Sequence, residues 1–180
     1  SVGGAWNSDG VILFGGTEGL YHIPASGGTP TLLTKASLTK DSGDTAHGFP
    51  QFADGKRFLY FAESPDQNTQ GIYASSLDHP QERTLVVRTA AKALYTPPLD
   101  GRPGSLLWLR ERTLLAQRFD AENLRLEGEP APLVEEIALN GHRAAFWTST
   151  AGVLGYRTTG GTANLLWIGR DGKRQASASP

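Results

Sequence analysis

Two residue types are missing altogether: the 180-residue chain has no cysteine and no methionine. The lack of cysteine excludes structural disulfides, thiolate nucleophiles and zinc sites with cysteine ligands. No apolar stretch approaches the roughly 20 residues that cross a bilayer, and no signal peptide is visible, so we expect no membrane contact. Because the chain does not begin with methionine, we expect it to be a fragment or a processed product of a longer protein.

An excess of charge of one sign is also missing. Seventeen lysines and arginines oppose 18 aspartates and glutamates, and the formal net charge is −1 at pH 7. No long basic run interrupts this balance, so we expect no nucleic-acid partner.

Patterns typical of metal sites and of helices are absent as well. The four histidines contain no pair at the spacing of a metal site: His22, His47, His79 and His142. The Asp-Gly pairs lack the alternating carboxylates that a calcium loop needs. Apolar residues never keep a 3.6-residue period over 11 positions, which argues against substantial helix. We therefore expect neither a bound metal nor a cofactor.

One pattern is repeated four times along the chain. A short aromatic strand, a tight turn, an apolar run, a glycine break and a second apolar strand recur, with turn glycines at positions 10, 55, 101 and 152. These glycines are 45, 46 and 51 residues apart. Repeats of this length, built from short strands, are typical of a β-propeller with one blade per repeat. The sequence therefore predicts a single all-β domain, a β-propeller with about four blades, spanning residues 3–35, 47–88, 93–135 and 143–179.

Aromatic residues in the middle strands of the repeats are candidates for the filling between blades. A single four-stranded sheet of this size cannot bury both of its faces, whereas sheets stacked around an axis can. Large aromatic side chains bury roughly 150–250 Å² each and would dominate such a core. We expect this filling from Phe14, Phe58, Tyr60, Trp108, Tyr156 and Trp167. The alternative role, a stacking platform for a carbohydrate or a base, is less favoured.

Two stretches carry a resemblance to a known family. The stretch from Trp6 to Phe14, the stretch from Phe52 to Phe61 and the Gly-Leu/Ile-Tyr strands that follow them resemble TolB-like (WD40-like, PD40) β-propeller repeats. The order of segments along the chain is most similar to the propeller C-terminal to many bacterial, notably acidobacterial, serine/threonine protein kinases. Such propellers usually have six or more blades, so the resemblance implies a partial propeller. It also implies a sensory or scaffolding role in a larger signalling protein, and an extracytoplasmic location.

Catalytic signatures are missing from the chain. The nucleotide loop, the His-Arg-Asp loop and the Asp-Phe-Gly segment of a kinase are all absent, and no Gly-x-Ser-x-Gly elbow is present. Glu135 and Glu136 are adjacent, so on a strand they would point to opposite faces and could not flank a glycosidic bond. We expect no catalytic residue and a non-enzymatic chain.

Three classes of function remain open. The first is an interaction or sensory module with a protein or peptide partner. The second is a small-ligand sensor that binds in the axial funnel through Trp6, His47, Tyr95 and Arg143. His47 and His142-Arg143 come just before inner strands and are placed to line the axial opening. The third, a hydrolytic propeller enzyme, is the least favoured. An incomplete ring would also expose apolar sheet faces, so we expect two copies to associate as a homo-oligomer that completes the ring.

Overall fold

The computed structural model describes residues 3–36, 43–149, 151–160, 165–168 and 174–178. Strands and turns account for the regular structure of these residues, and they contain no helix. Within this part of the chain, accordingly, no helix is long and apolar enough to cross a membrane. Most strands are short because glycine, proline or a polar turn follows each apolar run.

The first three repeats each fold into a four-stranded antiparallel meander. The first sheet contains β1 (Gly4–Trp6), β2 (Val11–Gly15), β3 (Leu20–Pro24) and β4 (Thr31–Leu32). The second contains β5 (Ala46–Phe52), β6 (Arg57–Glu63), β7 (Gly71–Ser76) and β8 (Thr84–Arg88). The third contains β9 (Leu94–Thr96), β10 (Ser105–Arg110), β11 (Thr113–Asp120) and β12 (Arg125–Val134). In each sheet the strands neighbour one another in chain order, which is the strand order of a propeller blade.

The fourth repeat does not form a single sheet among the described residues. It contains one hairpin of β15 (Phe146–Thr148) and β16 (Leu154–Tyr156) and another of β17 (Leu165–Ile168) and β18 (Arg174–Ala178). A further hairpin of β13 (Leu139–Asn140) and β14 (Arg143–Ala144) precedes them. No strand was expected between the third and fourth repeats, so β13 is an addition to the predicted pattern.

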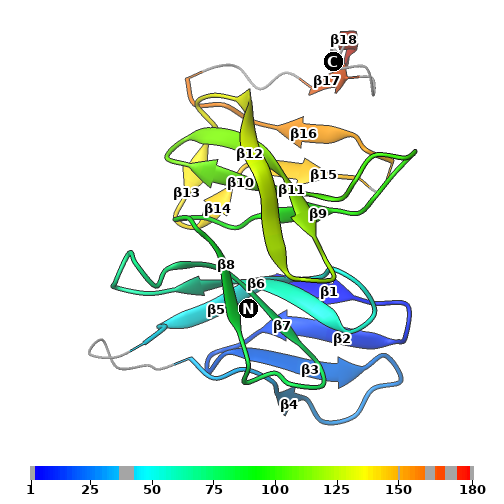
Figure 1. The fold of residues 1–180 in the computed structure, drawn as a ribbon, viewed down its shortest axis with the longest axis vertical. Coiled ribbons are helices and arrows are strands. Elements are labelled where there is room, and N and C mark those ends of the chain that lie inside the picture. The colour runs from blue at the N-terminus through cyan, green and yellow to red at the C-terminus, as the bar shows by residue number, and fades with distance from the viewer. Residues whose placement is uncertain (1–2, 37–42, 150, 161–164, 169–173, 179–180) are drawn as a thin grey trace.

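The sheets are stacked in chain order along the long axis of the molecule (Figure 1). Contacts join β1 and β2 to β5, β8 to β12, and β9 to β15. The first sheet and the last hairpin lie at opposite ends of the stack (Figure 1). The described strands therefore form an open arc of blades.

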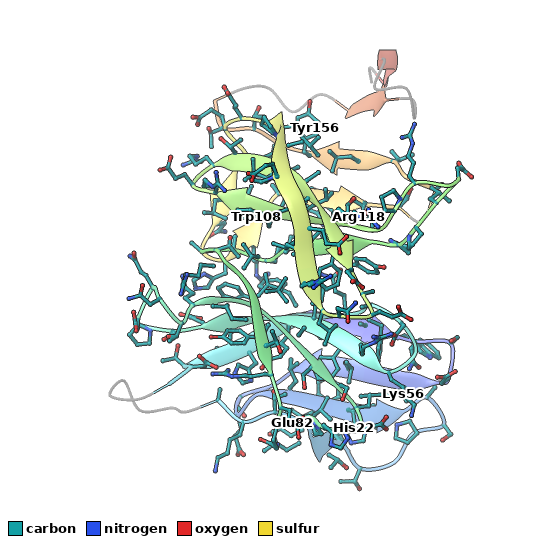
Figure 2. All side chains as sticks on the ribbon, in the orientation of Figure 1. His22, Lys56, Glu82, Trp108, Arg118 and Tyr156 are labelled. Carbon is teal, nitrogen blue, oxygen red and sulfur yellow. The ribbon has the colours of Figure 1, made fainter. Side chains whose placement is uncertain are left out.

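Each junction between neighbouring sheets holds its own apolar cluster. On β6, side chains alternate between the two faces: Phe58 and Tyr60 pack toward the first sheet, against Leu13 and Leu20 among others. Leu59 and Phe61 point the other way, into a cluster that contains residues of the third sheet. A third cluster joins the third sheet to the β13–β14 and β15–β16 hairpins. Side chains lie between successive sheets from the first sheet to the β15–β16 hairpin (Figure 2).

The expected aromatic filling is present in its central part. Phe58, Tyr60 and Trp108 are buried, as predicted, and Trp108 lies in the middle of the stack (Figure 2). Tyr156 packs at the margin of the third cluster. Phe14 instead stacks on Tyr21, with ring centroids 5.7 Å apart, on the face of the first sheet that points away from the second. The side chain of Trp167 lies outside the described residues.

The two faces of the first sheet differ in what covers them. Paired residues of antiparallel strands share a face. Leu13, which pairs with Ala5 and His22, faces the second sheet and is fully buried. The opposite face is apolar and only partly covered by the described residues; it carries Trp6, Ile12, Phe14, Tyr21, Ile23 and Leu32. We call these six residues the open face of the first sheet.

Polar side chains of the inner strands and linkers connect one blade to the next. Asn7 Nδ2 donates to the Gly55 carbonyl at 2.7 Å, and Gln51 Nε2 donates to the Ala93 carbonyl at 2.8 Å. Lys92 Nζ donates to the carbonyl of Phe146 at 3.0 Å, and burial lowers the pKa of this lysine. These hydrogen bonds hold the inner strands in register from blade to blade.

Two outer strands differ in length from the prediction. The expected strand over residues 29–34 is reduced to β4, because the amides of Leu33 and Thr34 both donate hydrogen bonds to the Leu20 carbonyl. The expected strand over residues 131–135 begins earlier, at Arg125, in a stretch predicted to be loop. Irregular register with β11 accommodates Gly128 and the two prolines of this edge strand.

Candidate functional site

A cavity of about 200 Å³ lies between the start of the second sheet and the β13–β14 hairpin. Strand β5, strand β6 and the hairpin each contribute to its wall. The lining residues are Ala46, His47, Gly48, Phe49, Phe61, Glu63, Asn140, Gly141, His142 and Arg143. The wall therefore combines apolar rings from the second sheet with charged and amide groups from both sides.

An irregularity in β5 shapes one wall of the cavity. Pairing between β5 and β6 shifts register between Gly48 and Gln51, as in a β-bulge. Phe49, inside the shifted stretch, has φ 51°, a left-handed conformation that bulky residues rarely adopt. Such a backbone costs about 1–3 kcal/mol and is concentrated at functional sites. Phe49 lines the cavity and also packs against the apolar cluster between the second and third sheets.

Glu63 and His142 form a polar contact across the cavity. His142 Nδ1 lies 2.7 Å from the Ala90 carbonyl, which can only accept, so Nδ1 carries a hydrogen. Nε2 lies 3.3 Å from Glu63 Oε1. The imidazole also lies near the Phe61 ring, with centroids 4.8 Å apart and the two planes tilted by 35°.

Arg143 is the one cationic group of the cavity wall without a carboxylate partner among the described residues. Its side chain is exposed at the rim, and the ion pairs found in the described part of the chain do not include it. In the β13–β14 register, Arg143 pairs directly with Asn140. The two side chains therefore leave the hairpin on the same side, and both line the cavity.

His47 reaches the cavity wall from a second, buried polar cluster. Its Nδ1 lies 2.8 Å from Thr34 Oγ1, and its Nε2 lies 3.1 Å from Asp44 Oδ2. The Arg83 guanidinium also binds Asp44 and lies over the ring of Tyr73. Both ring nitrogens of His47 are thus engaged inside the protein.

The charge on Asp44 is stabilised by these neighbours. Burial by itself opposes ionisation, but the hydrogen bonds from His47 and Arg83 outweigh it and hold the pKa of Asp44 below the ordinary 3.8. Burial raises the pKa of the neighbouring Tyr60 hydroxyl to about 12. Asp44 is therefore a carboxylate, and Tyr60 a neutral phenol, at any moderate pH.

The order of groups Thr34, His47 and Asp44 is that of a hydrolytic triad. Thr34 is only 3% exposed, and its hydroxyl already accepts the Leu20 amide hydrogen at 3.1 Å. A nucleophile needs an open face from which a substrate carbonyl can approach. This triad is closed within the junction between the first and second sheets.

The four residues predicted to bind a ligand divide into two pairs. His47 and Arg143 both line the cavity. Trp6 does not; it is 68% exposed on the open face of the first sheet. Tyr95 also lies elsewhere: its amide donates to Gln51 Oε1 at 2.8 Å, and its ring meets Phe119 edge-on at 5.5 Å between centroids.

Sequence reasoning did not single out Phe49, Phe61, Glu63 or Asn140 as members of this site. A signal for Phe49 was present, because a strand that contains Gly48 and Pro50 on either side of it is a strand with a bulge. Glu63 and Phe61 had no such signal. They look like ordinary alternating residues of β6 until the hairpin from the far side of the third sheet is placed beside them.

Metal-ligand groups do not gather at this site. In the described ranges, no cluster of three or more histidine or acidic side chains is arranged to hold a metal ion. The cavity itself offers one carboxylate, two imidazoles and one guanidinium.

Comparison with known proteins identifies the fold. No family model matches the sequence, and no curated protein matches it either. Among solved structures, regucalcin, a calcium-binding protein from Agrobacterium tumefaciens strain C58, superimposes with a TM-score of 0.61 at 15% sequence identity. The match covers 97% of this chain and 58% of that chain. The chain is a β-propeller, as predicted. It spans little more than half the length of its structural neighbour.

Proposed function

We propose that this chain is a non-enzymatic binding module, a propeller segment that holds a small ligand in the cavity between β5, β6 and the β13–β14 hairpin. The observation that carries the proposal is the bulge at Phe49. Phe49 keeps a left-handed backbone at the cavity wall, and strained backbone of this kind is concentrated at functional sites. Apolar walls with a few polar groups converging on them are typical of ligand sites.

The absence of an enzyme activity is part of the proposal. It is supported by the closed environment of Thr34 and by the lack of a second carboxylate beside Glu63 among the cavity's lining residues. The resemblance to kinase-associated TolB-like repeats supports a place in a larger signalling protein. We do not extend calcium binding from regucalcin to this chain, because the described residues contain no cluster of metal-ligating side chains.

A cavity-filling variant tests the binding proposal. Asn140 lies exposed on the wall, so Asn140→Trp places an indole in the cavity without disturbing a buried group. A screen of single-ring compounds by ligand-observed NMR should give hits with the wild type that disappear with this variant. Thr84→Trp, at an exposed position of β8, is the matched control and should keep every hit. Hits that persist in Asn140→Trp would contradict the proposal.

A second candidate function rests on the open face of the first sheet. We propose that this face docks a sheet of a second copy, since its composition matches the faces that pack on each other inside the arc. Trp6 and Leu32 are the most exposed of its six residues. Light scattering at micromolar concentration should give a dimer mass, and Ile12→Lys should reduce it to the monomer mass. A monomer mass for the wild type contradicts this role and leaves the cavity unaffected.

A further inference from the structure

We infer that the ligand of the cavity is a small organic monocarboxylate with a planar apolar body, bound by Arg143 and Asn140 through the carboxylate and by Phe49 and Phe61 through the ring. This inference rests on the proposed function and adds the chemical class of the ligand. Three independent features of the cavity lead to it: charge, hydrogen-bond geometry and size.

Arg143, the guanidinium of the cavity wall that lacks a carboxylate partner among the described residues, favours an anionic ligand. His142 lies within ion-pair distance of Glu63, at 3.3 Å, whereas Arg143 has no carboxylate partner among the described residues. A ligand with one negative charge supplies the missing partner. A dianion such as a phosphate monoester would place its second charge in the same cavity as Glu63, where like charges repel.

The hydrogen-bond donors match a carboxylate. The arginine guanidinium presents a planar fork that binds the two oxygens of a carboxylate side by side. Asn140, directly opposite Arg143 in the hairpin register, adds an amide donor on the same side. Gly141 between them has φ 57°, which lets the tight turn bring both side chains to one rim.

The size of the cavity limits the body of the ligand. An apolar cavity of about 150 Å³ admits benzene, so the volume of about 200 Å³ found here accommodates one six-membered ring with one small substituent. Phe49, which is only partly buried, offers its ring to such a body, while Phe61, 2% exposed and next to the His142 imidazole, forms an apolar part of the wall. Behind them, both ring nitrogens of His47 are engaged, at 2.8 Å from Thr34 and 3.1 Å from Asp44, so His47 supports the wall and makes no direct bond to the ligand.

Isothermal titration calorimetry with phenylacetate, phenylacetamide, acetate and phenethylamine tests the inference. Phenylacetate should bind, while phenylacetamide, which lacks the charge, and acetate, which lacks the ring, should bind at least about tenfold more weakly. Arg143→Gln should weaken phenylacetate binding by about tenfold or more. Arg143→Lys should weaken it less, since lysine keeps the positive charge but lacks the planar guanidinium that binds both carboxylate oxygens. Asn140→Asp should also weaken it, by repulsion. Arg125→Gln, an exposed arginine of β12, is the control and should leave binding unchanged.

The outcomes separate this inference from the proposed function. If phenylacetamide binds as well as phenylacetate and Arg143→Gln has no effect, the ligand class is wrong but the cavity still binds rings. If phenethylamine binds best and Glu63→Gln abolishes its binding, the anchor is Glu63 and the inference is overturned. If no ring compound binds the wild type, or Asn140→Trp leaves the binding of these compounds intact, both the inference and the proposed function fail.

Discussion

Two polar clusters meet at strand β5 and differ in how their charges are satisfied. In the first cluster, Asp44, His47, Thr34 and Arg83 hold one another at the junction of the first and second sheets, and Asp44 is almost fully buried. In the second, Glu63 and His142 are partly exposed, and Arg143 has no ion-pair partner in the described part of the chain. We interpret the first cluster as structural and the second as the place where a ligand completes the set of charges.

The comparison predicts that removing a charge from the first cluster lowers stability. Arg83→Leu leaves the buried Asp44 carboxylate with His47 alone and removes the cation from the Tyr73 ring. Breaking a fully buried pair costs about 3–5 kcal/mol. Because the Arg83 side chain is 35% exposed, we expect a smaller loss, about 2 kcal/mol of unfolding free energy by urea titration.

A matched control shows whether burial is the cause. Arg112→Leu breaks an ion pair with Glu136 whose side chains are both well exposed, and it should change the unfolding free energy by less than about 0.5 kcal/mol. Equal losses in the two variants would mean that the first cluster is no more structural than a surface pair.

Acid should act on the same cluster. The pKa of Asp44 is lower in the folded chain than its ordinary 3.8, so the unfolded chain takes up this proton at a higher pH than the folded chain. Asp44 therefore stabilises the fold above about pH 4, and this contribution disappears as pH falls through the lower, folded value. Unfolding free energies measured between pH 2.5 and 6 should fall less steeply with acid in Asp44→Asn than in the wild type. Parallel pH profiles would rule out this role.

The bulge at the second cluster gives a prediction about backbone strain. In an ordinary strand, glycine is about 0.5–1 kcal/mol less stable than alanine. At position 49 the left-handed φ of 51° should reverse this order, so Phe49→Gly should be more stable than Phe49→Ala by about 1 kcal/mol. At Phe52, in the same strand and outside the positive-φ residues, alanine should be the more stable. Both pairs can be compared by thermal unfolding. The usual order at position 49 would mean that the bulge is unstrained.

Much of the fold followed from sequence because each blade is a local structure. The Asp-Gly turns and the apolar runs around them placed β5 to β8 almost to the residue, since a hairpin is specified by neighbouring residues. The ends of the outer strands were less accurate. Strand β12 runs through Gly128 and two prolines, which an edge strand tolerates and which local propensity treats as a break.

Only half of the site was predictable, because it depends on contacts between residues that are far apart in the sequence. His47 and Arg143 were chosen because both come just before inner strands, where loops converge on the axis of a propeller. Glu63 and Phe61 depend on the β13–β14 hairpin, which follows β6 by more than 70 residues and whose first strand was not predicted. Trp6 was chosen because it belongs to an inner strand expected to line the axial funnel, but its side chain lies on the open face of the first sheet.

The smallest expected effect on stability is at the second cluster. Arg143→Gln should change the unfolding free energy by less than about 0.5 kcal/mol, because the exposed guanidinium makes no ion pair that the fold depends on. Chemical denaturation of this variant beside Arg83→Leu shows the contrast between the clusters in one experiment. A loss comparable to that of Arg83→Leu would place Arg143 among the structural charges.

The most direct measurement is an amide chemical-shift titration of the wild type with phenylacetate. We predict shifts at Ala46 to Phe49 on β5, at Phe61 and Glu63 on β6, and at Asn140 to Arg143 in the β13–β14 hairpin. In the first sheet, only the amides of β1 and β2 that contact β5 should shift. Shifts centred on the open face of the first sheet, or none at saturating concentration, would contradict the assignment of the cavity as the binding site.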